Sequence, residues 1–223
     1  MAQEQSWTDD DRTELLESIR SAIIGEVRLA KRAKDEIVEY CSEAYIADTC
    51  PENEHDKFIQ SAADEFNRAV AAHESEKVGW PAVTDCDRLD RVEVALRDRG
   101  IIFWQASPCC DSCTVADLPD RIELINNRHS GFRSRVRGYA FFIDQTLPEQ
   151  LADDTQLTVC LAYGWFSPDD SKVDPNAYEA KALGIAREVC ECLRAEGFEP
   201  DWEGSFDRKI RAKVNWQRRT KLE

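Results

Sequence analysis

The first third of the chain places apolar side chains at the three- and four-residue spacing of an α-helix. The helical pattern begins at Thr8, where Asp11 three residues later completes the form of a capping box, and it continues to about Tyr45. A polar interruption at 31–34 predicts a bend or a division into two helices. A second long helix is predicted over 55–76. The apolar stripes of these two segments are complementary, which predicts an antiparallel helical hairpin.

The rest of the chain mixes strand-like apolar runs with helical stripes. Gly79 and Pro81 interrupt the helical pattern, so we predict an N-terminal helical hairpin at 1–79 and a second domain at 80–223. Strands are predicted at 101–106, 139–143, 157–163, 198–202 and 209–216, and helices at 84–100, 114–127, 147–153 and 177–195. These elements predict an α+β fold in which helices pack on a small mixed sheet of about five strands. The last strand alternates apolar and basic residues, which is typical of a half-solvated edge strand.

Charge and composition exclude some classes of function. The 223 residues carry a formal net charge of −15, which argues against binding to nucleic acid or to anionic membranes. The stretch 206–223 is basic, with seven Lys/Arg against two Asp/Glu, and is interpreted as a solvated tail, a local anion site or a surface for a second subunit. No apolar run approaches membrane-spanning length, and the acidic N-terminus does not resemble a secretory signal. We therefore predict a soluble, cytoplasmic protein.

Cysteine is the residue type with the clearest chemical interest. Nine cysteines in a reducing compartment are expected to be thiols, and an odd number fits that expectation. Six are scattered and are interpreted as small buried apolar residues: Cys41, Cys50, Cys86, Cys160, Cys190 and Cys192. The other three, Cys109, Cys110 and Cys113, lie between a predicted strand and a helix that we expect Thr114 and Asp117 to cap.

Three interpretations of this cysteine loop are open. Cys110 and Cys113 have the Cys-x-x-Cys spacing of a redox dithiol, and a helix N-terminus would stabilise a thiolate, although the charge of Asp111 opposes it. The second interpretation is a zinc site, whose ligands would be Cys109, Cys110 and Cys113 with His129, Cys160 or a neighbouring chain as the fourth. The third is a loop whose sulfurs only fill space. We favour the third, because the acidic neighbours and the missing ligands argue against reactivity.

Four short motifs carry a resemblance to a known family. They are Leu96 to Ile101, Cys109-Cys110-Asp-Ser-Cys113, Gly138-Tyr139-Ala-Phe141 with the later Leu161-Ala-Tyr163-Gly164, and Trp202-Glu-Gly204 followed by Arg208-Lys-Ile210. Through these motifs, residues 88–219 resemble a bacterial family of unknown function. The resemblance implies a shared fold and does not indicate which activity the family has. Its members often carry Gln-Asp after the Gly-Tyr strand, where this chain has Asp144-Gln145.

The remaining functional expectations are few. Trp202, Gly204 and Arg208 are candidate binding residues, with a core tryptophan before a tight turn as the alternative. Phosphate-binding glycine loops, His-Glu-x-x-His and Gly-x-Ser-x-Gly are absent from the sequence. Our leading prediction is a non-enzymatic bacterial interaction or regulatory module that binds a protein partner or a second copy of itself. The alternative is thiol-redox or zinc-dependent activity at Cys109, Cys110 and Cys113, zinc being the single cofactor under consideration.

Overall fold

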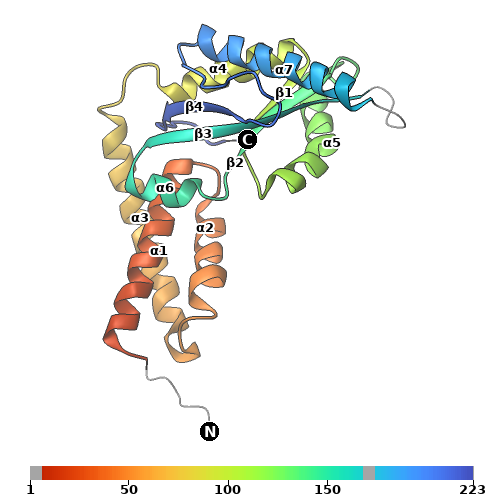
Figure 1. Cartoon of the computed structure of the whole chain (residues 1–223). Helices are drawn as coiled ribbons and strands as arrows, with labels where there is room; N and C mark the ends of the chain where they lie inside the picture. The colour runs from red at the N-terminus through yellow and green to blue at the C-terminus, as the bar shows by residue number, and fades with distance from the viewer. Residues whose placement is uncertain (1–6, 168–173, 223) are drawn as a thin grey trace. The chain divides into compact units, whose positions relative to one another are not determined.

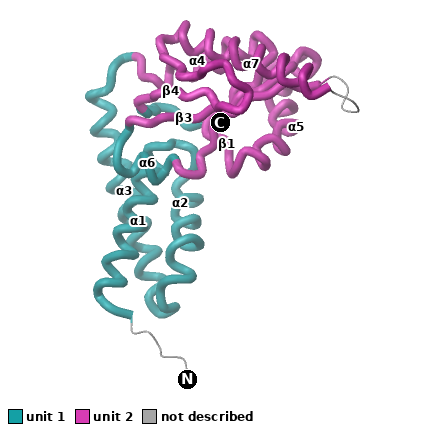
Figure 2. The backbone as a smooth tube through the Cα atoms, in the orientation of Figure 1, with its two compact units in different colours: residues 1–82, 147–155, 216–223 teal, residues 83–146, 156–215 magenta. Residues whose placement is uncertain are grey.

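The computed structural model describes residues 7–167 and 174–222. It divides into two compact units, which Figure 2 colours separately. The first unit comprises Met1–Ala82, Leu147–Thr155 and Trp216–Glu223, and the second comprises Val83–Thr146 and Gln156–Asn215. The chain returns to the first unit twice, at 147–155 and at 216–223, and no local sequence pattern encodes this return. The division into domains at 1–79 and 80–223 stays a prediction.

The first unit is helical (Figure 1). Its elements are α1 (Asp9–Leu29), α2 (Lys34–Cys41), a π-helical turn (Ser42–Ile46), a 3-10 turn (Glu52–Glu54), α3 (His55–Lys77) and α6 (Leu147–Asp153). The capping box of Thr8 and Asp11 is confirmed, since each residue's side chain bonds the backbone N–H of the other. Ala30 has a left-handed backbone (φ 58°) that ends α1, so the polar interruption separates two helices. The core of this unit is apolar, with Ile23, Ile46 and Ala62 fully buried.

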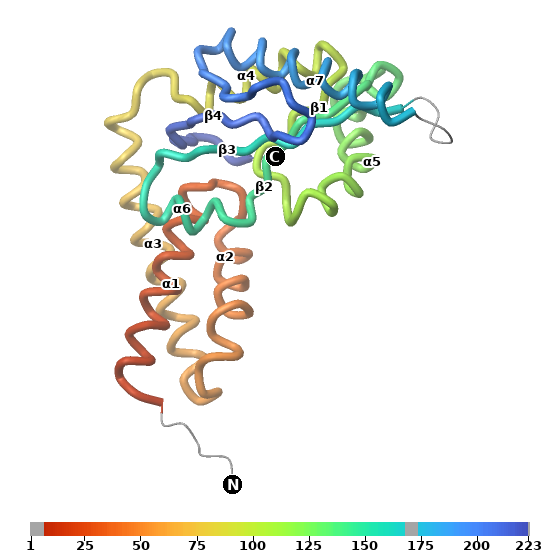
Figure 3. The backbone as a smooth tube through the Cα atoms, in the orientation of Figure 1, coloured from red at the N-terminus to blue at the C-terminus, as the bar shows by residue number. Residues whose placement is uncertain are grey.

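The two long helices run in the same direction, and the predicted antiparallel arrangement was wrong. Three ion pairs show this, because their residue numbers increase together along the two helices: Arg12 to Glu54 (2.6 Å), Arg20 to Glu65 (3.3 Å) and Arg28 to Glu76 (2.9 Å). The physical reason is α2, which carries the chain back before α3 begins. Figure 3 shows this up-down-up course.

Hydrogen bonds join the segments that return to the first unit to the C-terminal end of α1. Arg28 donates from Nη1 to the Leu151 carbonyl oxygen at the end of α6 (2.7 Å). The Trp216 indole N–H donates to the Arg28 carbonyl oxygen (3.1 Å), and the Leu222 N–H donates to that of Ala30 (2.8 Å). These bonds satisfy carbonyl groups that the end of a helix leaves without partners.

The second unit holds the sheet, and the predicted α+β class is confirmed. Its elements are α4 (Asp85–Asp98), β1 (Ile101–Ser107), α5 (Asp111–Arg128), β2 (Gly138–Ile143), β3 (Gln156–Trp165), α7 (Pro175–Ala195) and β4 (Ile210–Asn215). The strand order is β1-β2-β3-β4, with β1 parallel to β2 and the other pairs antiparallel. The sheet is therefore mixed, and β4 lies at an edge as predicted.

The described sheet has four strands, so the predicted strand at 198–202 was wrong. That segment forms one isolated bridge, between Asp201 and Arg211. Pro200 has no backbone N–H to donate to a neighbouring strand. Gly197, directly before this segment, has a left-handed backbone (φ 86°), so an extended strand cannot continue through it.

Helices cover the two faces of the sheet unequally. α4 and α7 lie on one face and α5 lies on the other (Figure 1). On the α5 face, Ile102, Leu118 and Phe132 form a small buried cluster. None of the described helices is both long enough and apolar enough to cross a membrane.

Candidate functional site

The three clustered cysteines lie where β1 passes into α5. The helix begins at Asp111, and Cys110 is its N-cap residue, with an extended backbone (φ −87°, ψ 171°). Thr114, which the sequence predicted as the start of this helix, lies in its first turn instead and is fully buried. Its hydroxyl lies 3.1 Å from the Ser107 hydroxyl and 3.2 Å from the Pro108 carbonyl oxygen. The predicted cap was wrong because the threonine bonds back to the loop, which lets the helix start one turn earlier.

The three sulfur atoms converge. They all lie within 4.8 Å of one another, and the Sγ atoms of Cys110 and Cys113 are 3.5 Å apart. Side chains of adjacent residues in an extended chain point in opposite directions, so Cys109 and Cys110 should diverge. Cys109 instead has a left-handed backbone (φ 66°), a conformation that costs a residue other than glycine about 1–2 kcal/mol. This bend brings its sulfur to the other two.

The exposure of the cluster argues against the space-filling interpretation that we favoured from the sequence. Cys109 and Cys113 are exposed, and Cys110 is half-buried. A sulfur that faces solvent contributes little to packing, whereas it can be reached by a reagent or an ion.

Hydrogen bonds make the thiols of Cys110 and Cys113 unequal. The N–H groups of Cys113 and Ser112, together with the Cys113 thiol, lower the pKa of Cys110 to about 7. Interactions with the side chains of Cys109 and Cys110 raise the pKa of Cys113 to about 11. Asp111 was expected to oppose a thiolate, but Lys209 lies 2.5 Å from its Oδ2 atom and compensates that charge. No local sequence pattern indicates this pairing, because Asp111 and Lys209 lie far apart in the chain.

The proposed fourth zinc ligands do not join the cluster. His129 follows the last residue of α5, an 18-residue helix about 27 Å long, so it lies at the opposite end from the cysteines. Cys160 is an exposed residue of β3 and is not part of the three-sulfur group. The ligand set within the described residues is therefore Cys109, Cys110 and Cys113 alone. A ligand from a neighbouring chain stays a prediction.

Comparison with known proteins places the chain in a family. A sequence-family model described as a domain of unknown function (DUF6891) matches residues 12–220. The chain belongs to the DUF6891 family. The predicted resemblance to a family of unknown function is thereby confirmed, and the match also takes in most of the N-terminal helices. No curated protein and no solved structure matches this chain.

The scattered cysteines of this DUF6891 chain are mostly buried, as predicted. Cys41, Cys50, Cys86, Cys190 and Cys192 are all buried, and burial raises the pKa of Cys41 to about 12. Cys160 is the exception. It alternates along β3 with buried Leu157, Val159 and Leu161, so it points to the exposed face. That alternation is visible in the sequence and could have identified it.

The other predicted site residues of the DUF6891 chain form a turn. The Trp202 indole N–H and the Tyr163 hydroxyl both donate to the Ser205 carbonyl oxygen, at 3.1 and 3.0 Å. Gly204 has a left-handed backbone (φ 86°) that permits this turn. Arg208 pairs with Glu203 at 3.5 Å on the surface. These contacts favour a role in holding the turn, and ligand binding there stays a prediction.

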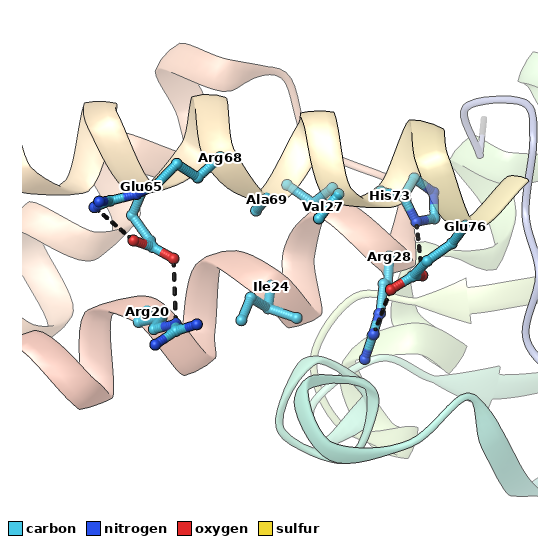
Figure 4. Close-up of a pocket in the computed structure, with 10 residues that line it drawn as sticks. Arg20, Ile24, Val27, Arg28, Glu65, Arg68, Ala69, His73 and Glu76 are labelled. Carbon is cyan, nitrogen blue, oxygen red and sulfur yellow. Dashed lines mark hydrogen bonds and ion pairs between the residues drawn. The ribbon is translucent and has the colours of Figure 1, made fainter.

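The helical unit of the DUF6891 chain contains a cavity of about 280 Å³ between α1 and α3 (Figure 4). Its charged lining is engaged in ion pairs, Arg20 and Arg68 with Glu65 and Arg28 with Glu76. His73 is buried at one end, and burial lowers its pKa. Because these ion pairs join α1 to α3, we interpret the cavity as a gap in the packing of the two helices.

Proposed function

We propose that this protein carries out thiol–disulfide exchange through Cys110 and Cys113. The observation that carries the proposal is the geometry of the pair: two solvent-accessible sulfurs 3.5 Å apart, one of them at the N-cap of a helix. Donors in the first helical turn favour the thiolate form of Cys110, which is the nucleophilic form. The interaction-module prediction stays a prediction, because no comparable observation supports it.

The reaction begins with the thiolate of Cys110 and an external disulfide, RSSR. The thiolate attacks one sulfur, the RS–SR bond breaks, and RS⁻ leaves with the electron pair and takes a proton from water. The Cys113 thiol then gives its proton to solvent and attacks the Cys110 sulfur, and the second RS⁻ leaves. Two protein thiols are oxidised to a disulfide while RSSR is reduced to two thiols. The protein's own disulfide runs the sequence in reverse.

Little movement is required for the second step. A disulfide bond is about 2.05 Å long, so the two sulfurs must approach by roughly 1.5 Å, which side-chain rotation can supply. Thr114 supports the loop, because its buried hydroxyl contacts Ser107 and Pro108 on the segment that leads to the cysteines. We assign Thr114 as a positioning residue.

The experiment uses the reduced, metal-free full chain and bis(2-hydroxyethyl) disulfide, a neutral disulfide. Free thiols are alkylated at intervals, and mass spectrometry identifies the linked cysteines. We expect a Cys110–Cys113 disulfide in the parent chain, and in Cys113→Ser a mixed disulfide that stays on Cys110. Cys160→Ser is the matched control, since it removes an exposed thiol outside the cluster and should behave as the parent chain does. Equal reaction of Cys110 and Cys160, with no internal disulfide, would refute the proposal.

A further inference from the structure

Thiol–disulfide exchange needs two thiols, yet the loop brings three together. The third is Cys109, whose left-handed backbone turns its sulfur toward the other two. Strained backbone at an exposed loop is a reason to look for a function.

The spacing of the three sulfurs matches that of ligands around one metal ion. A zinc–sulfur bond is about 2.3 Å, so two sulfurs on one ion lie roughly 3.8 Å apart in tetrahedral geometry and roughly 4.0 Å apart in trigonal geometry. Here one pair is 3.5 Å apart and every pair lies within 4.8 Å. Shifts of under about 1 Å would bring the set to coordination distances.

We propose that the sulfurs of Cys109, Cys110 and Cys113 in the reduced protein bind one thiophilic metal ion, of the zinc or copper(I) class. Thiolate ligands select these ions over magnesium and calcium, which prefer oxygen. Each coordinated sulfur gives its proton to the buffer, and the ion takes the place of the thiol hydrogen bonds. The cluster is exposed, so a fourth coordination position faces solvent.

Metal binding and disulfide formation exclude each other at this site. A Cys110–Cys113 disulfide removes the charge of two ligand sulfurs and leaves Cys109 alone, which cannot hold the ion. Conversely, an ion held by Cys110 occupies the electron pair with which that sulfur would attack a disulfide. This exclusion rests on the proposed thiol–disulfide function, whereas the metal site by itself does not.

Cys109→Gly is the variant that separates the two activities. Glycine adopts a left-handed backbone without cost, so the loop keeps its course and only the third sulfur is lost. The reduced full chain is titrated with Zn²⁺ against a chelating dye, and with Co²⁺ to record sulfur-to-metal charge-transfer absorption. Cys160→Ser is again the control.

We expect the parent chain and Cys160→Ser to bind one Zn²⁺ and Cys109→Gly to bind it at least about 100-fold more weakly, since loss of an outer-shell contact alone costs up to that factor. Metal-free Cys109→Gly should still form the Cys110–Cys113 disulfide. The parent chain should lose the ion when Cys110 and Cys113 are oxidised to the disulfide. In the reduced parent chain, bound Zn²⁺ should slow formation of that disulfide at least about tenfold.

Unchanged zinc affinity in Cys109→Gly would overturn the proposal, and so would equal affinity in the oxidised protein or loss of binding in Cys160→Ser. Failure of the metal-free chain to form the disulfide would instead contradict the proposed function and the exclusion. In that case the dependence of zinc affinity on Cys109 would still decide the metal site.

Discussion

Replacing Cys113 by alanine should change how the reactivity of Cys110 depends on pH. With a pKa of about 7, half of Cys110 is thiolate near neutral pH, against roughly 1% for the ordinary value of 9.0. That is about 50 times more thiolate. The nucleophilicity of each thiolate falls about tenfold over two pKa units, because the Brønsted coefficient is close to 0.5. Cys110 in the parent chain should therefore react about five times faster than an ordinary thiol near pH 7.

Cys113→Ala removes the thiol donor and keeps the backbone N–H of residue 113, which is the larger cause of the lowered pKa. The pKa of Cys110 should therefore rise only part of the way to its ordinary value. The variant should react more slowly than the parent near neutral pH and faster well above it, because each thiolate is more nucleophilic. Cys113→Ser retains a hydroxyl donor, so the pKa of Cys110 in this variant should lie between its values in the parent chain and in Cys113→Ala.

The assay is alkylation of metal-free protein by iodoacetamide at a series of pH values. The modified peptides are quantified by mass spectrometry, and Cys160 in the same chain serves as the internal comparison. The reasoning fails if the rate at Cys110 has its midpoint near the ordinary cysteine pKa, or if the curves of the parent and Cys113→Ala coincide. The first result would mean that the first-turn donors do not act on the Cys110 sulfur, and the second would mean that the Cys113 thiol does not.

Three further predictions concern stability, measured by urea unfolding. Thr114→Val should cost about 1–2 kcal/mol and slow disulfide formation, because its buried hydroxyl bonds the cysteine loop, while Thr114→Ser should retain most of both. Gly25→Ala should lower the free energy of unfolding by about 1–3 kcal/mol, because the added Cβ would lie 1.9 Å from the Pro148 carbonyl oxygen. Gly184→Ala is the matched control: its Cβ meets no atom within 4 Å, so it should stabilise α7 by about 0.5–1 kcal/mol. Burial lowers the pKa of His73 below 6.5, so the unfolded chain binds more protons below about pH 6.5 and stability should fall as pH drops from about 7 to 5; His73→Phe should flatten that slope.

Local patterns in the sequence determined most of the secondary structure. The capping boxes of Thr8 with Asp11 and Thr84 with Asp87 mark the starts of α1 and α4, because a cap needs only residues three positions apart. The alternation along residues 209–216 identified β4 as an edge strand for the same reason, since a period of two is a local property. The family resemblance also came from short motifs.

Tertiary structure decided the direction of the long helices and the membership of the helical unit. The parallel course of α1 and α3 depends on α2, and Trp216 joins α1 through a bond to Arg28 across most of the chain's length. Such contacts join residues far apart in sequence, so no local period records them.

The cysteine site shows the same division. The sequence determined that three thiols lie within five residues beside a helix start. It did not determine that Cys110 would be the N-cap, because that depends on Thr114 bonding back to the loop. The convergence of the sulfurs depends on the backbone of Cys109, and a left-handed φ at a residue other than glycine is held by the surrounding fold, not by the identity of that residue.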